Sequence, residues 1–254
     1  MNFMDLIVIE FAKTKRAKII PLILLPPLLV VISGVASISR YFTPEYANPW
    51  QAMFIQSVLL LGYYLLPFSM VIVCAMLAGR ERKDNGILKM LSLPVSRVKL
   101  ALSKFVVLLY YLSFELVTFF IIFIVAGLIS TQTAAITEPL PMTYILKWSA
   151  YLFISALPCV AVMWLFNVIF SKAALSIGLN LFLIIPGVLV ANTPLWVLYP
   201  YCYNGYLVSC EMHRLTEGAT NIIFNSSAFL PCAILIFIIA LLISVSQFGK
   251  KEMR

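Results

Sequence analysis

The chain carries six apolar stretches, each long enough to cross a lipid bilayer as a helix. A spanning helix needs about 17–20 predominantly apolar residues, and all six stretches meet this limit. Since lipid offers no hydrogen bonds to the backbone, such segments must be helical, and none shows the period-2 alternation of a membrane barrel. The sequence predicts an all-α polytopic membrane protein with one transmembrane domain over residues 1–254. The six expected spans are Ile19–Ile38, Phe54–Ala78, Ala101–Ile129, Ile145–Phe170, Ala173–Ala191 and Ala228–Gln247.

Composition and charge placement agree with a membrane chain. Hydrophobic residues make up 63% of the sequence and charged residues 11%, against about 25% charged residues in soluble domains, which excludes a soluble enzyme. With the N-terminus inside the cell, all but three of the 18 lysines and arginines fall on the inner side, the exceptions being Arg40, Lys147 and Arg214. This bias follows the positive-inside rule. It predicts cytoplasmic termini and explains the net charge of +8 without nucleic-acid binding.

The chain lacks the residue patterns of common catalytic and metal sites. Its one histidine, His213, lies in an outer segment, and no HExxH, GxSxG or phosphate-binding G-x-x-x-x-G-K-[ST] motif occurs. No catalytic residue and no metal ligand are therefore expected. Cys202 and Cys210 share the outer segment 192–227, where oxidation is permitted. A disulfide between them is one possibility, which spacing alone does not decide.

A few polar residues lie within the expected spans. Glu115 is the only ionisable residue of the sequence that lies well inside an expected span. An acid at this depth costs about 2.5–3.5 kcal/mol on insertion scales. Tyr63 and Tyr64 of the second span reach a similar depth, and we hypothesise that Glu115 bonds one of them. Glu115 either lies by a substrate path, where it would attract cationic peptides, or forms a structural hydrogen bond. Asn167 and Asn180 are expected to form interhelical amide bonds. The intramembrane candidates are Glu115, Tyr111, Tyr63, Tyr64, Asn167 and Asn180.

Residues 1–18 precede the first span and mix apolar residues with Asp5 and Glu10 before a basic end. This pattern suits a helix that lies at the inner membrane interface, with its apolar side among the acyl chains and its lysines at the headgroups. A flexible, positively charged leader is the alternative.

The inner loop Gly79–Lys104 reads as more than a connection. Asp84 or Asn85 can cap a short helix with apolar residues at helical spacing, and Pro94 ends it. Ser96 can cap the next helix, which we expect to continue into the third span. A short helix of this kind suits a docking element for another protein, while an ordinary topology-fixing basic loop is the alternative.

The residues of both inner segments resemble those of a known family. Glu81, Gly86 and the run Leu91–Arg97, with Lys104 seven residues on, are similar to the coupling segment of ABC-2-type transporter permeases. The leader Glu10–Arg16 is similar to the N-terminal elbow helix of that family. The resemblance implies two sets of functional residues. The ATPase-coupling set, within residues 80–98, is Glu81, Gly86, Leu88, Leu91, Leu93, Pro94, Ser96 and Arg97, and the elbow set is Glu10, Lys13 and Arg16.

The resemblance implies a half-transporter of the bacterial plasma membrane. ATP and magnesium would bind a separate cytoplasmic ATPase subunit, so this chain would carry no cofactor. A second permease chain, identical or different, would complete the substrate path. Segment 192–227 would fold back as short helices on the external side. The small size is most like permeases that export amphipathic antimicrobial peptides, including lantibiotic-immunity, bacitracin-type and phenol-soluble-modulin exporters. A proton-coupled secondary transporter using Glu115 and a non-transporting membrane anchor or assembly protein are the alternatives.

Overall fold

The computed structural model describes residues 2–15, 18–37, 48–82, 96–133, 138–170, 172–216 and 224–248. All regular elements within these ranges are helical, as predicted. In chain order they are α1 (Phe3–Thr14), α2 (Ile19–Ala36), α3 (Pro49–Leu60), the π-helix η3 (Leu61–Leu65), α4 (Leu66–Arg82), α6 (Arg97–Thr133), α7 (Met142–Ile169), α8 (Ala173–Ile184), α9 (Gly187–Ala191), the 3-10 helices η5 (Pro194–Leu198) and η6 (Pro200–Cys202), α10 (Tyr203–Thr216) and α11 (Ser226–Gln247).

Five segments of the described chain are long and apolar enough to cross a membrane, which confirms five of the expected spans. They are Ile19–Ala36, Pro49–Gly79, Arg97–Thr131, Met142–Ile169 and Ser226–Gln247.

The expected span Ala173–Ala191 is not confirmed as one helix. It forms α8 and α9, which are separated at Ile185 and Pro186, and α8 alone has 12 residues. Proline lacks a backbone N–H and clashes with the preceding helical turn. The Tyr199 hydroxyl donates a hydrogen bond to the Leu183 carbonyl in the last turn of α8, so a side chain satisfies a carbonyl next to the break.

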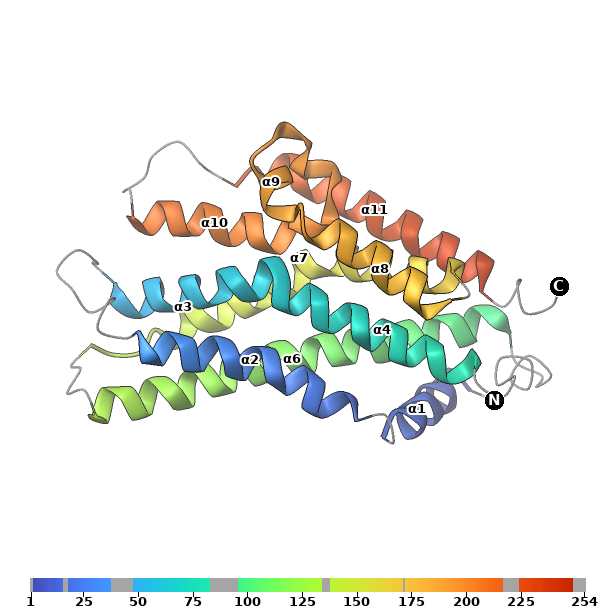
Figure 1. Ribbon diagram of the computed structural model, residues 1–254, viewed down its shortest axis with the longest axis horizontal. Helices are drawn as coiled ribbons and strands as arrows, with labels where there is room; N and C mark the ends of the chain where they lie inside the picture. The colour runs from blue at the N-terminus through green and yellow to red at the C-terminus, as the bar shows by residue number, and fades with distance from the viewer. Residues whose placement is uncertain are drawn as a thin grey trace.

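The long helices run side by side, and the basic segments gather at one end of the bundle. In Figure 1 the end of α4, the beginnings of α6 and α8, and the end of α11 lie at the right, next to α1. The lysines and arginines in or next to these segments whose side chains the structure describes are Lys13, Lys15, Lys18, Arg97, Lys99, Lys104 and Lys172. We call this the basic end. The charge distribution predicts that this end faces the cytoplasm.

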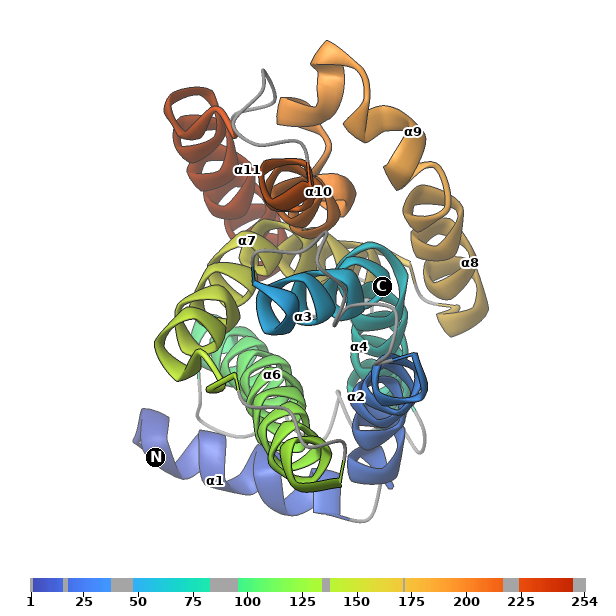
Figure 2. The ribbon, with the colours of Figure 1, turned by 90° about the vertical axis from the view of Figure 1, so that its left-hand side faces the viewer.

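Helix α6 is the longest element, with 37 residues, and it packs against α1, α2, α4, α7 and α11. Phe54 of α3 is fully buried against Phe119 and Phe123 of α6, and the ring centroids of Phe54 and Phe123 are 5.1 Å apart. Helix α1 does not run along the bundle. It lies across the basic end, beneath α6 and α2, as Figure 2 shows.

Candidate coupling site at the basic end

Helix α1 buries a polar face and exposes an apolar one. Leu6, Glu10 and Thr14 recur every fourth residue, so they share one side of the helix, and all three are buried. On another side, Met4 is 71% exposed and Val8 is 66% exposed. Water would not favour this arrangement, but the boundary between headgroups and acyl chains would, because it accepts apolar side chains.

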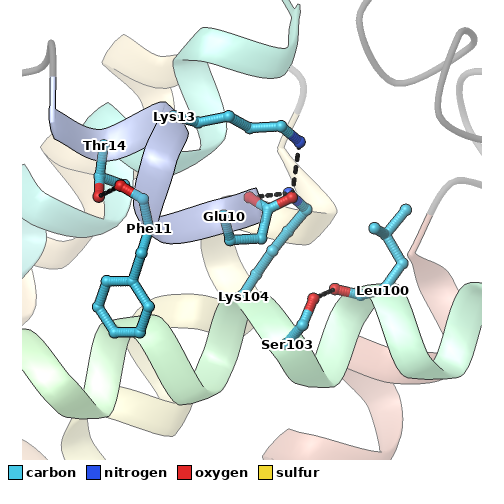
Figure 3. Close-up of polar contacts among 7 residues, drawn as sticks. All are labelled: Glu10, Phe11, Lys13, Thr14, Leu100, Ser103 and Lys104. Carbon is cyan, nitrogen blue, oxygen red and sulfur yellow. Dashed lines mark hydrogen bonds and ion pairs between the residues drawn. The ribbon is translucent and has the colours of Figure 1, made fainter. Parts of the chain in front are cut away.

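The Glu10 carboxylate binds two lysine ammonium groups, one from its own helix and one from α6. Lys13 Nζ lies 2.6 Å from Glu10 Oε1, and Lys104 Nζ lies 2.8 Å from Glu10 Oε2. Figure 3 shows the carboxylate between the two lysine side chains. The Glu10 residue is 5% exposed and Lys104 is 3% exposed. The pair between α1 and α6 is therefore almost fully withdrawn from solvent.

Two further contacts fasten the same face of α1 to α6. The Tyr111 hydroxyl donates to Thr14 Oγ1 over 2.7 Å. The rings of Phe11 and Tyr110 meet edge to face, with their centroids 4.7 Å apart. Lys104 and Tyr111 are separated by about two helical turns, so α1 contacts α6 at two separate points.

Helix α6 connects this junction directly to the predicted coupling segment. Ser96 Oγ accepts the Lys99 N–H over 3.4 Å, which confirms the predicted cap, and α6 then continues unbroken from Arg97 into its span. Lys104 therefore lies about two turns after the segment ends. The side chain of Glu81, in the last turn of α4, lies outside the described residues. So do Gly86, Leu88, Leu91, Leu93, Pro94 and Arg16.

The predicted partner of Glu115 was wrong. Glu115 is fully buried between α4 and α6, and its two carboxylate oxygens lie 2.8 and 2.6 Å from Ser69 Oγ. Depth counted from the expected span ends, Phe54 and Ile129, pointed to Tyr63 or Tyr64, but α3 begins at Pro49 and α6 ends at Thr133. Ser69, about two turns further along, faces the acid. Tyr111, on the expected polar stripe, bonds Thr14 instead.

Tyr63 and Tyr64 lie in η3, away from Glu115. The Tyr63 hydroxyl shares a hydrogen bond of 3.1 Å with Ser209 of α10, while Tyr64 packs against the rings of Tyr63 and Phe68. The Tyr63 ring lies directly over Gly205, where an added Cβ would come within 2.1 Å of it. Helix α10 is thus packed closely against the π-helix, a contact that only glycine permits at this position.

The two asparagines behave differently. Asn180 Oδ1 accepts a hydrogen bond of 2.6 Å from the Tyr201 hydroxyl, which links α8 to η6 and agrees with the expected interhelical role. Asn167 Nδ2 donates to the Met163 carbonyl, four residues earlier in its own helix. The amide of Asn180 therefore ties the broken segment α8–α9 to the turns that follow it.

Cys202 and Cys210 are free thiols in the structure, so the possible disulfide is not formed. Cys202 ends η6 and Cys210 lies within α10. Eight residues along a helix span about 12 Å, whereas disulfide-bonded residues have Cα atoms about 4.4–6.8 Å apart. Cys202 Sγ instead donates to the Tyr199 carbonyl over 3.1 Å.

The sequence did not reveal that the leader and the third span meet through Glu10 and Lys104. These residues are 94 positions apart, and each fits a local pattern of its own. Thr14, Phe11 and Tyr110 were also missed as contact residues. The available signal was the four-residue spacing of Glu10 and Thr14 in a helix that is mostly apolar.

The family model described as ABC-2 family transporter protein matches residues 6–187, well over half of the chain. The chain belongs to this family. The match begins in α1, includes α6, and ends where α9 begins. It therefore contains both Glu10 of α1 and Lys104 of α6, which form the ion pair between these helices. No curated protein matches the chain. As an ABC-2 family member, the chain is an integral membrane protein and a membrane component of an ABC transporter. Members of the ABC-2 family act with an ATPase partner and are not themselves catalytic.

Proposed function

We propose that the chain is the permease subunit of an ATP-driven exporter, and that a separate cytoplasmic ATPase binds the segment between α4 and α6. One observation carries the proposal: the family match runs through α4 and α6, the helices on either side of this segment in the chain, and through α1, which packs against α6. The sequence also contains no G-x-x-x-x-G-K-[ST] motif, so the energy for transport would come from the partner.

The basic end of the bundle would face the cytoplasm, with both chain ends on that side. The described lysines and arginines support this orientation, because short loops rich in these residues remain inside. In this orientation α1 would lie in the inner leaflet boundary as the elbow helix, and α10 would fold back at the outer side. Two such permease chains would pair around the substrate path.

Amphipathic peptides are the substrate class that we propose. An apolar groove of about 290 Å³ lies between α6 and α7, and Ser113 and Ser149 are among its lining residues. A groove of this character suits an amphipathic or lipophilic molecule better than a small polar solute. The peptides exported by lantibiotic-immunity, bacitracin-type and phenol-soluble-modulin transporters have this chemistry.

Copurification tests the ATPase part of the proposal. The tagged chain, expressed in its own cells and extracted in mild detergent, should bring down an ABC ATPase. Leu91→Asp or Leu93→Asp should abolish this association at an unchanged membrane level. Pro139→Asp adds the same charge in an exposed stretch between α6 and α7 and should retain the ATPase. Absence of any ATPase with the unaltered chain would contradict the proposal.

A peptide-sensitivity assay tests the substrate class. Cells with and without the chain are exposed to a lantibiotic, to bacitracin and to a phenol-soluble modulin, in the presence and absence of the partner ATPase. We expect protection against at least one peptide, only when both proteins are present. Protection that persists without the ATPase would favour the proton-coupled alternative. That alternative needs an acid accessible to protons, and Glu115 is fully buried against Ser69.

A further inference from the structure

We propose that Glu10 is a positioning residue for ATP coupling: its carboxylate fastens α1 to α6, so that both helices move as one unit with the coupling segment. This inference rests on the proposed function, because it assumes an ATPase that acts on the segment between α4 and α6. It goes further by assigning a role to a buried ion pair that joins two distant parts of the chain.

The contact geometry fixes α1 against rotation and against sliding along α6. Glu10 meets Lys104 at 2.8 Å, and Tyr111 meets Thr14 at 2.7 Å. These two polar contacts lie about two turns apart on α6. A helix held at two such points follows its partner.

Burial explains why the two helices stay joined when α6 moves. The Lys104 side chain is 3% exposed and the Glu10 side chain is 6% exposed. Separating them would leave charges in a poorly solvated site, which is strongly unfavourable. A displacement of α6 is therefore more easily accommodated by moving α1 with it than by breaking the pair.

The exposed side of α1 permits this movement. Met4 and Val8 are largely exposed, and both are apolar, so this surface contacts the fluid acyl boundary in the proposed orientation. Lipid contacts can be exchanged as the helix shifts, whereas the contacts of Glu10 and Thr14 with α6 are specific. The polar face would thus transmit the movement while the apolar face keeps α1 in the membrane.

Lys13 shows that binding to the same carboxylate is not sufficient for this role. It lies three residues from Glu10 on the same helix, and its side chain is 35% exposed. The pair of Lys13 and Glu10 therefore stays within α1. Of the two ion pairs of Glu10, the one with Lys104 joins α1 to the helix that continues from the coupling segment.

The test compares Glu10→Gln with a matched carboxylate-to-amide change, Asp5→Asn. Asp5 lies on the same helix, is exposed, and accepts the Asn2 backbone N–H, a bond that asparagine can also accept. The complex with the partner ATPase is purified in lipid nanodiscs, and the amount of assembled complex is measured for each variant. ATP hydrolysis is measured per complex, and peptide protection is measured in cells with the peptide that responds most strongly to the unaltered chain.

For Glu10→Gln we expect ATP hydrolysis per complex within about twofold of the unaltered complex and protection lowered by about tenfold per assembled complex. Asp5→Asn should match the unaltered chain in both. The exchange Glu10→Lys with Lys104→Glu rebuilds the pair in reverse and should recover most of the protection. A purely structural role would lower the amount of assembled complex without lowering protection per complex.

Each result separates this inference from the proposed function. If no ATPase accompanies the unaltered chain, the proposed function and this inference both fail. If the ATPase binds and hydrolyses ATP but Glu10→Gln protects as well as the unaltered chain per complex, only the role of Glu10 is overturned. If Glu10→Gln does not assemble, the exchanged pair decides: recovery of coupled protection supports the inference, and an assembled but uncoupled exchange variant contradicts it.

Discussion

Glu10 and Glu115 are both buried acids, but the molecule holds them in different ways. Glu10 at the basic end lies between two lysine ammonium groups, and one of these comes from another helix. Glu115 in the middle of α6 has Ser69 as its hydrogen-bond partner, across the contact with α4. The first arrangement is an ion pair between helices, and the second joins an acid to a hydroxyl.

Position within the membrane alone therefore does not indicate which buried acid joins two helices by an ion pair. Acids within spans are costly and are often functional, which made Glu115 a candidate from the sequence. Its surroundings are those of a packing contact, however, since it is fully buried against Ser69 and does not line the groove between α6 and α7. Glu10 lies in a plain amphipathic leader and nevertheless connects two elements of the proposed coupling region.

Glu10→Gln should have the largest effect on stability. It removes an acidic partner from Lys104, whose ammonium is nearly excluded from solvent, so we expect a loss of about 3–5 kcal/mol. Thermal unfolding of the purified chain in detergent measures this change. A loss no greater than that of Asp5→Asn would show that the ion pair is not needed for stability, and the contrast with Glu115 would disappear.

Ser69→Ala should have the next largest effect. It leaves the Glu115 carboxyl group buried without its hydroxyl partner, which costs about 1–3 kcal/mol. Ser103→Ala is a suitable control, because Ser103 is also fully buried and its hydroxyl bonds the Leu100 carbonyl within α6. Equal unfolding temperatures for the two variants would contradict a specific contact between Ser69 and Glu115.

The sequence predicted those parts of the fold that depend on local composition. Five spans, the cap at Ser96 and the continuity of α6 follow from apolar length and capping residues near each boundary. The break at Pro186 was not anticipated, because prolines such as Pro158 remain inside helices here. Whether a proline ends a helix depends on neighbours, such as Tyr199, that supply other partners for the backbone.

The candidate site was predictable only in its separate halves. Glu10 was assigned to the leader and Lys104 to the region of the coupling segment, but no local pattern indicates a contact across 94 positions. The partner of Glu115 was missed because depth was counted from the expected span ends, Phe54 and Ile129. In the structure α3 begins at Pro49 and α6 ends at Thr133, so residues at equal depth lie further along the chain than expected.

Glu115→Gln should have a smaller effect, about 0.5–1 kcal/mol. Ser69 has one hydroxyl hydrogen, but its oxygen lies near both Glu115 oxygens and the Leu66 carbonyl. Glutamine keeps an acceptor and adds N–H donors, so the contact can be retained without the acid. Unfolding and peptide protection should both be measured. Intact folding together with lost protection would place Glu115 on the transport path.

Lys13→Gln should have the smallest effect, about 0.2–0.5 kcal/mol, as for other pairs between neighbouring turns of one helix. Its ammonium is 2.6 Å from Glu10, closer than that of Lys104, but the Lys13 side chain is 35% exposed. Distance and burial therefore predict opposite rankings of the two lysines. Because water screens an exposed ion pair and not a buried one, we expect Lys104→Gln to destabilise the chain several times more than Lys13→Gln. Equal losses in detergent unfolding would mean that contact distance, rather than exclusion from solvent, determines how firmly α1 is held.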